Sequence, residues 1–469
     1  MVYLLLAGIA LLLFLSFKFI DRDFISPVNL YLLFSALAVA GMFLCYVEWK
    51  VDEYGFKASA VYLVGSLCFA FGCYLAKRIS SKPVKVKEKP ELNEDMSDEA
   101  DGREVKRIEI GYVKIAIMSA VTLAALVGTW IWLIKLEEGS SDYTIAQAIN
   151  YRRTMDIQGK LVGEYAKGRI WMLLTEFSGA FASIAIFVFV RNAVNRKLVK
   201  RDILLWIPIM VCILEFLSLS NRSGIFVMAF TAIISWFVSM KVKCRWKETL
   251  NKKVIKTAAI ALAVFIPVFF GSLFIVGRHL SLKHFGYKEY TAIYVSGGVR
   301  CLDWYMKEPT DPPKRFGEET LVALHANLYS RFGIGENTTR YLEWRNLDDE
   351  PVANTYTSFR RFYHDFGIAG VVILTLLQGL IISVLYYKIQ RRSERDKISF
   401  VEVMYCYLAH TTVYIAIDDL FYSSWASLYG IKMTMIMFAA YFLMFCIMRK
   451  ETGGIAIDWK RIGVKNAKD

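Results

Sequence analysis

The sequence predicts an all-α fold that crosses a membrane many times. Of its 469 residues, 56% are hydrophobic, 15% are aromatic and only 21% are charged, and the mean hydropathy is +0.38. A helix needs about 20 mainly apolar residues to cross the hydrocarbon core of a bilayer. Eleven apolar segments approach or reach that length, at residues 2–17, 28–47, 58–76, 112–134, 170–190, 203–219, 225–240, 254–276, 366–387, 401–417 and 425–448.

The expected spans form a single integral membrane domain, because no break in composition divides the chain. The first apolar segment has no basic residue before it and no small-residue cleavage site. It is therefore expected to be a retained span rather than a signal peptide.

Basic residues gather in alternate connections between the spans. Residues 77–107, 191–201, 241–256, 388–397 and the tail 449–469 hold 32 of the 57 Lys and Arg residues. Cytoplasmic connections carry such an excess, so we expect the amino terminus outside and the carboxyl terminus in the cytoplasm. This bias accounts for most of the net charge of +14. It does not indicate nucleic-acid binding, because the basic residues lie in short loops beside spans.

Three polar stretches interrupt the apolar pattern. Residues 80–107 mix dense charge of both signs without apolar periodicity, which predicts a disordered cytoplasmic linker. Residues 135–169 are expected to form an outer loop with an interfacial helix near 143–155. Residues 277–365 are too long for a passive connection between spans, so function is expected on the outer face. This large outer loop contains two helical-looking pieces, at residues 290–306 and 317–332.

Motifs for nucleotide, metal and serine chemistry are missing from the sequence. There is no G-x-x-x-x-G-K-[ST], H-E-x-x-H or G-x-S-x-G, and Gly333-Ile-Gly335 is not followed by the rest of a dinucleotide fingerprint. The five His residues lack metal-ligand spacing, and the Cys residues form no C-x-x-C pair. We therefore expect no cofactor and no metal site.

The outer stretches are instead rich in arginine. A guanidinium group binds two phosphate oxygens at once and stays charged at physiological pH. Arginines clustered at the outer membrane surface suit a lipid-linked diphosphate. The outer arginines are Arg152, Arg153, Arg169, Arg222, Arg278, Arg300, Arg315, Arg331, Arg340, Arg345, Arg360 and Arg361.

Two of these arginines are placed at membrane level by the sequence alone. Arg222 lies in the very short turn Ser220-Asn-Arg-Ser-Gly224 between two spans, where a following helix would add amide donors facing an anion. Arg278 directly follows the eighth span. For both, the alternative is a basic side chain that simply reaches the interface from the end of a span.

A third position is the stretch Asn354-Thr-Tyr-Thr-Ser-Phe-Arg-Arg-Phe-Tyr-His-Asp-Phe-Gly367, which leads into the ninth span. In a helix, Arg361 and Asp365 are four residues apart and could pair only with each other. Arg360 then lies about 100° away around the helix and is freer to meet a ligand.

Acidic residues near the span ends are candidates for orienting these arginines. Glu215 lies within the sixth span, where an acidic side chain is costly and usually functional. It could orient Arg222, or pair with Lys432 of the last span, and Glu176 is a further candidate for orienting an outer Arg. The adjacent carboxylates that end the tenth span, Asp418 and Asp419, are expected to form a solvated helix end.

The stretch that begins at Asn354 resembles the O-antigen and capsule repeat-unit polymerases, the Wzy type. The resemblance lies in an Asn-x-Tyr-Thr start, an Arg several residues on, and Asp365-Phe-Gly-Ile-Ala-Gly370 entering an apolar span. The layout is also similar, with a short Arg-containing turn and a large outer loop before the last few spans. A Tyr/Gly-containing segment, Tyr294-Val-Ser-Gly-Gly-Val-Arg-Cys-Leu-Asp303, lies where such proteins often have one.

This resemblance implies a multi-pass glycosyltransferase of the bacterial cytoplasmic (inner) membrane that acts on the outer face. It would join oligosaccharide repeat units carried on undecaprenyl diphosphate, with lipid-linked donor and acceptor, into O-antigen, capsule or exopolysaccharide. Such an enzyme needs no nucleotide sugar, which agrees with the missing nucleotide motifs. A flippase and a chain-length regulator would be its further partners.

Under this resemblance, positive charge has to meet the leaving undecaprenyl diphosphate. The first candidates are Arg222, Arg278 and Arg360, and the next are Arg152 and Arg169, with Arg361 if it is not paired with Asp365.

Other roles at the site have candidates of their own. Asn354 and Tyr356 could hydrogen-bond sugar or phosphate, although Asn354 could equally cap the following helix. Candidates for a general base on the acceptor hydroxyl are His325, His364 and Asp365. The alternatives are an amphipathic-helix position for His325, an exposed loop position for His364 and a pair with Arg361 for Asp365.

Two other functions stay open at the level of sequence. A lipid-linked oligosaccharide flippase or other transporter would also bind diphosphate through Arg. Transporters usually show internal repeats and short loops, whereas this sequence shows no repeat and one long loop at 277–365. An O-antigen ligase would use the same donor chemistry with a different acceptor, and only the Asp365-Phe-Gly motif favours the polymerase.

Overall fold

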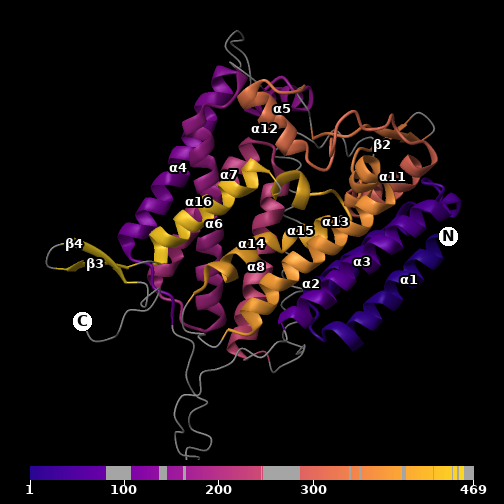
Figure 1. Cartoon of the computed structure of the whole chain (residues 1–469). Coiled ribbons are helices and arrows are strands. Elements are labelled where there is room, and N and C mark those ends of the chain that lie inside the picture. Colours follow the sequence, from indigo (N-terminus) through magenta and orange to yellow (C-terminus); the bar gives the residue numbers. More distant parts are fainter. Residues whose placement is uncertain are drawn as a thin grey trace, which may run out of the picture.

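The computed structural model describes residues 1–80, 107–136, 145–161, 165–244, 246, 286–336, 340–347, 350–392, 398–425, 427–445, 447–451 and 454–458. These residues form a bundle of long, tilted helices with short helices and a hairpin at one end (Figure 1). The elements are α1 (Val2–Leu15), η1 (Ser16–Ile20), α2 (Pro27–Gly41), η2 (Met42–Cys45), η3 (Val51–Glu53), α3 (Phe56–Ser80), α4 (Tyr112–Lys135), α5 (Ile145–Ile157), α6 (Arg169–Val194), η6 (Lys200–Leu205), α7 (Trp206–Ser218), α8 (Arg222–Lys243), α11 (Tyr287–Lys307), α12 (Val322–Phe332), β1 (Arg345–Leu347), β2 (Glu350–Ala353), α13 (Ser358–Gln390), α14 (Phe400–Leu408), α15 (His410–Tyr414), η8 (Phe421–Trp425), α16 (Leu428–Phe445), β3 (Ile447–Glu451) and β4 (Gly454–Asp458).

The chain is an all-α polytopic membrane protein, as its sequence predicts. Within the described residues, eight helices are long and apolar enough to cross a membrane. A helix satisfies all of its backbone hydrogen bonds internally, which lipid requires. These eight correspond to expected spans and comprise Val2–Ile20, Pro27–Cys45, Phe56–Ser80, Tyr112–Lys135, Arg169–Val194, Arg222–Lys243, Ser358–Gln390 and Leu428–Phe445.

Two of the three remaining expected spans are divided in the structure. Residues 203–219 are helical but are divided between η6 and α7. Residues 401–417 are divided between α14 and α15, and the chain then leaves the helix before Asp419. The Asp419 carboxylate accepts the amides of Phe421, Tyr422 and Ser423 at 2.9–3.0 Å, so it provides partners for the first amides of η8. Residues 254–276 lie outside the described residues.

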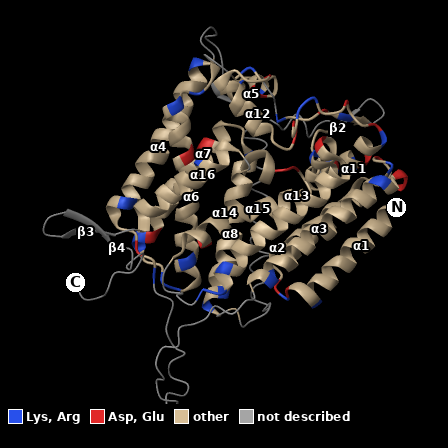
Figure 2. Cartoon of the chain, in the orientation of Figure 1, with Lys and Arg blue, Asp and Glu red and all other residues tan. Residues whose placement is uncertain are grey.

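Charged residues gather mainly at the two ends of the bundle (Figure 2). One end, here called the α11 end, carries α5, α11, α12 and the antiparallel β1–β2 hairpin (Figure 1). At the opposite end Lys241 lies 3.1 Å from Asp23, and Lys243 donates to the Val194 carbonyl at 3.0 Å. The basic connections 191–201 and 241–256 therefore meet at the same end, as their alternation along the chain predicts.

Several smaller expectations are met by the described residues. The helix expected near 143–155 is present as α5, and the two helical pieces expected at 290–306 and 317–332 are α11 and α12. Most of the expected linker, 80–107, lies outside the described residues. The start of the expected tail, by contrast, forms an antiparallel hairpin in which Ile447 pairs with Asp458.

Helix α13 lies against α3 with very close backbone contact. A Cβ atom on Gly72 would lie 2.1 Å from the Leu376 carbonyl oxygen, and one on Gly379 would lie 2.4 Å from the Phe69 carbonyl oxygen. Only glycine permits this approach at both positions. The contact fixes α13, whose first turns lie at the α11 end.

Candidate functional site

The first turns of α13 form a short helical piece that is separated from its membrane-spanning remainder. Gly367 has φ +61° and ψ −154°, a conformation essentially restricted to glycine. A Cβ atom on Gly370 would lie 2.5 Å from the Phe362 carbonyl oxygen. The two glycines of Asp-Phe-Gly-x-x-Gly therefore build a break in the helix, and residues 358–366 present their side chains independently of the span.

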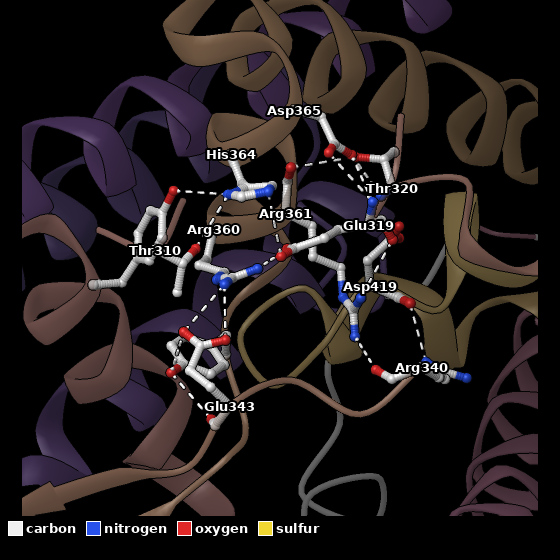
Figure 3. Close-up of polar contacts among 12 residues, drawn as sticks. Thr310, Glu319, Thr320, Arg340, Glu343, Arg360, Arg361, His364, Asp365 and Asp419 are labelled. Atoms are coloured by element: carbon white, nitrogen blue, oxygen red, sulfur yellow. Dashed lines mark hydrogen bonds and ion pairs between the residues drawn. The ribbon is translucent and has the colours of Figure 1, made fainter. Parts of the chain in front are cut away.

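Arg360 is fully buried between two carboxylates (Figure 3). Its Nη2 donates to both oxygens of Glu343, at 3.1 and 2.9 Å, and its Nη1 forms an ion pair with Glu319 Oε2. The guanidinium carbon lies 4.6 Å from the ring centre of Tyr305 and 4.9 Å from that of Tyr356. The expectation that Arg360 is freer to meet a ligand is therefore wrong, because buried charges need such partners.

Arg361 joins a second carboxylate rather than Asp365. Its Nε lies 2.9 Å from Asp418 Oδ1, and its Nη2 donates to the Arg340 carbonyl at 3.0 Å. Arg340 Nη2 lies 2.9 Å from Asp418 Oδ2. Burial alone would raise the pKa of Asp418, but Arg361 and Arg340 outweigh burial and hold that pKa below its usual value.

The expected solvated helix end is therefore wrong for both adjacent carboxylates. Asp418 is held between two arginines, and Asp419 is fully buried with its carboxylate on backbone amides. The charge pattern of the sequence could not show this, because Arg340 and Arg361 approach from distant segments.

His364 lies on α13 and is nearly buried, so its expected exposed loop position is wrong. Its Nδ1 lies 3.1 Å from the Tyr305 hydroxyl and 3.5 Å from Thr310 Oγ1, and its Nε2 lies 3.6 Å from Glu319 Oε1. Burial raises the pKa of Tyr305, although Arg360 opposes this.

Asp365 caps the turn that contains Glu319. Its carboxylate accepts the Glu319 amide at 3.1 and 3.2 Å and the Thr320 amide at 2.6 Å. It does not pair with Arg361, so that sequence-based alternative is wrong. The residue at the centre of these contacts, Glu319, was missed by sequence reasoning, because nothing in Gly317-Glu-Glu-Thr320 distinguishes it from a surface acid.

A second set of side chains forms around the start of α8. Asn221 Oδ1 accepts the Gly224 amide at 3.0 Å and caps the helix. Arg222, the first helical residue, is buried, and its Nη1 donates to the Tyr290 hydroxyl at 2.9 Å. Its guanidinium lies 5.5 Å from the ring centre of Tyr294. Arg222 is therefore held at the amino-terminal end of α8, directly after the short turn.

Two arginines of α5 lie in the same region. Arg152 lies 5.7 Å from the ring centre of Trp132, pairs with Asp156 at 3.3 Å and donates to the Leu219 carbonyl just before the α7–α8 turn. Arg153 has no ion pair within the part of the chain that the structure describes. Burial and the nearby Arg222 lower its pKa, while neighbouring tyrosines oppose this. Arg152, Arg153 and Arg222 are here called the basic cluster.

The residues at the start of α13 and their partners, Arg360, Arg361, His364, Asp365, Glu319, Glu343 and Asp418, are here called the α13 network. One extended segment connects the basic cluster to this network. The Tyr341 hydroxyl donates to Asp156, the partner of Arg152, at 3.1 Å. The preceding residue, Arg340, binds Asp418. The two sets of side chains are therefore neighbours at the α11 end.

The acidic residues inside the spans have partners other than those expected. Glu215 lies 3.6 Å from Lys167 and accepts the Thr175 hydroxyl at 2.6 Å. Glu176 pairs with Lys432 at 2.6 Å. The expected pairings of Glu215 with Arg222 or Lys432 are wrong, since Lys167 reaches Glu215 from the loop before α6.

The other candidates lie in different surroundings. Tyr356 is buried and donates to Glu343 Oε1 at 2.8 Å, so it supports the α13 network. Asn354 does not cap α13, which begins after Thr357. Two candidates lie away from these contacts. Arg169 is exposed at the start of α6. His325 lies on α12, and its Nε2 lies 3.0 Å from the Phe316 carbonyl. Arg278 lies outside the described residues.

The described residues contain no group of three or more His, Cys, Asp or Glu that could hold a metal ion. Comparison of the chain with family models, with curated proteins and with solved structures finds no match. The candidate site is therefore defined by its own geometry: a basic cluster next to a buried network of arginine, carboxylate and histidine.

Proposed function

We propose that this protein is a membrane glycosyltransferase that joins oligosaccharide repeat units carried on undecaprenyl diphosphate into O-antigen, capsule or exopolysaccharide. The observation that carries the proposal is the position of the basic cluster beside the α13 network at one end of the bundle. In the proposed orientation this end faces the outside of the bacterial cytoplasmic membrane.

The basic cluster suits the diphosphate of a lipid carrier. The lipid chain keeps its headgroup near the ends of the spans, and Arg222 is held there by the α7–α8 turn. Arg153 has no carboxylate on its guanidinium within the described residues, so its charge is available to a ligand. As the sugar–diphosphate bond breaks, charge develops on the leaving diphosphate, and preorganised guanidinium groups stabilise it. Arg278 remains a candidate for the same role by its place in the sequence.

The α13 network suits the sugar side of the reaction. It supplies carboxylates and an imidazole within a few ångströms of one another. Moving a proton from a sugar hydroxyl requires such a group. A flippase would need to bind the diphosphate but would have no need for this second set, and the glycosyltransferase is therefore the better account.

The test replaces Arg222 and Arg153 by Ala in cells that depend on this protein for polymer. Each variant should lose long polymer while single repeat units still reach the outside and protein level in the membrane stays normal. Lys at either position should restore polymer only in part, because an ammonium keeps the charge but loses the two-pronged contact.

Arg315→Ala is the matched control, since this arginine lies at the same end but pairs with the exposed Glu336 at 2.8 Å. It should leave polymer normal. Repeat units trapped inside the cell would identify a flippase. Normal polymer that is not attached to its final acceptor would identify a ligase, and a normal polymer ladder in both variants would show that the basic cluster is an interfacial anchor.

A further inference from the structure

The polar side chains at the start of α13 converge on one residue of another segment, Glu319. Arg360 holds its carboxylate oxygen Oε2, and His364 Nε2 lies 3.6 Å from Oε1 (Figure 3). Arg361 Nη1 donates to its backbone carbonyl at 3.2 Å, and Asp365 accepts its backbone amide at 3.1 Å. The backbone and the side chain of Glu319 are thus both fixed. An ion pair with Arg360 alone would require only the side-chain contact.

Glu319 also keeps an open oxygen. Within the part of the chain described, the one polar contact of Oε1 is His364 Nε2 at 3.6 Å, and 14% of the side chain is exposed. In Asp418 both oxygens lie on arginines, in Asp365 both lie on backbone amides, and in Glu343 both lie on Arg360. Glu319 differs from these three carboxylates because one of its oxygens, Oε1, lies on no arginine and no backbone amide within the described residues.

We propose that Glu319 is the general base of the glycosyl transfer, a role that rests on the proposed function. Oε1 takes the proton from a hydroxyl of the incoming sugar unit as that oxygen forms its bond to the anomeric carbon of the donor. The bond between the anomeric carbon and the diphosphate oxygen breaks, and the diphosphate leaves with the electron pair. The proton on Glu319 passes to water before the next transfer.

Arg360 and His364 are then positioning residues. Arg360 fixes Oε2 and balances the negative charge of Glu319 in a buried place. The Tyr305 hydroxyl lies 3.1 Å from Nδ1 of His364, and Nε2 lies 3.6 Å from Oε1. In this proposal the hydroxyl donates to Nδ1, so that the neutral imidazole carries its proton on Nε2. Both contacts fix the orientation of the carboxylate, and the exposed 14% of the side chain leaves an approach for an acceptor hydroxyl.

The experiment compares purified wild-type protein with Glu319→Gln on a lipid-diphosphate-linked repeat unit. We expect kcat to fall by about 10²–10⁴-fold, the usual contribution of a general base, with KM little changed. Glu318→Gln is the matched control, because the hydrogen bond to this neighbouring acid within the described residues comes from the Lys314 amide, at 2.7 Å, and not from α13. It should keep wild-type kinetics.

The outcomes separate the two proposals. Wild-type protein that makes no polymer from this substrate would contradict the proposed function. Active wild-type protein with a fully active Glu319→Gln variant would overturn the role of Glu319 alone, as would a large rise in KM at unchanged kcat. If the Gln variant does not accumulate in the membrane, Glu319→Asp keeps the charge and withdraws the oxygen, and wild-type kcat in that variant would also overturn the role.

Discussion

At the scale of single residues, buried partners prevail over helical spacing. Arg361 and Asp365 are four residues apart on α13, yet Arg361 binds Asp418 and Asp365 binds the Thr320 amide. An exposed pair at this spacing is worth about 0.3–0.5 kcal/mol. A hydrogen bond to a charged group contributes about 1.5–3 kcal/mol and leaves a larger penalty if it is lost. The tertiary contacts therefore decide the pairing.

The depressed pKa of Asp418 makes a testable contribution to stability. Replacing Asp418 by Asn leaves Arg340 and Arg361 without their shared carboxylate, and we expect a loss of about 1–3 kcal/mol at pH 7. The lower part of this range is expected, because a quarter of the Asp418 side chain is exposed and solvent screens the pair. Thermal unfolding in detergent measures the difference.

The sign of the pH dependence follows from the direction of the pKa shift. A carboxyl group whose pKa is lowered on folding contributes stability that is present above its unfolded value, 3.8, and is lost as the pH falls through the folded value. The gap between wild type and Asp418→Asn should therefore shrink in acid. A gap that stays constant down to pH 3 would show that the ionised carboxylate is not what stabilises this site.

At the scale of elements, the contact between α3 and α13 positions the site. The two backbones approach each other at Gly72 and Gly379, and α13 then breaks at Gly367 to orient residues 358–366. Small residues allow such close approach between helices in membranes. The candidate site is thus held by a helix pair, although its residues lie at the surface end of the bundle.

We expect Gly379→Ala to destabilise the protein by about 1–3 kcal/mol, the usual cost of overpacking a tight contact. The added Cβ would meet the rigid carbonyl of Phe69 rather than a flexible side chain. Gly179→Ala is the control, because a Cβ there has nothing within 4 Å. An equal unfolding temperature for the two variants would contradict the close packing of α3 and α13.

At the scale of the whole molecule, the orientation of the bundle is the premise of the proposed function. The connections rich in Lys and Arg, 77–107 and the tail 449–469, should be cytoplasmic. Reporter fusions after Lys89 and after Asp469 should both report cytoplasm, and a fusion after Asp311 should report the outside. An external signal from either of the first two would place the basic cluster on the cytoplasmic side and remove the basis for an outward-facing transferase.

The sequence by itself determined the membrane class, the expected position of eight spans and the alternation that brings basic connections to one end. It also placed Arg222 at the end of a helix. These features depend on hydropathy, turn length and charge, which act over a few neighbouring residues. The divided helices at 203–219 and 401–417 were not predicted, because the hydropathy of an apolar segment is the same whether its helix is continuous or divided.

Only the tertiary structure decided which carboxylate meets which arginine. Arg360 meets Glu343 and Glu319, 17 and 41 residues away along the chain, and Glu319 has no local signal. The physical reason is that a buried charge has to find a partner with favourable geometry wherever the fold supplies one. The position of each span follows from the hydropathy of neighbouring residues. The polar network depends on distances that exist only once α13 has packed against the segments that contain Glu319 and Glu343.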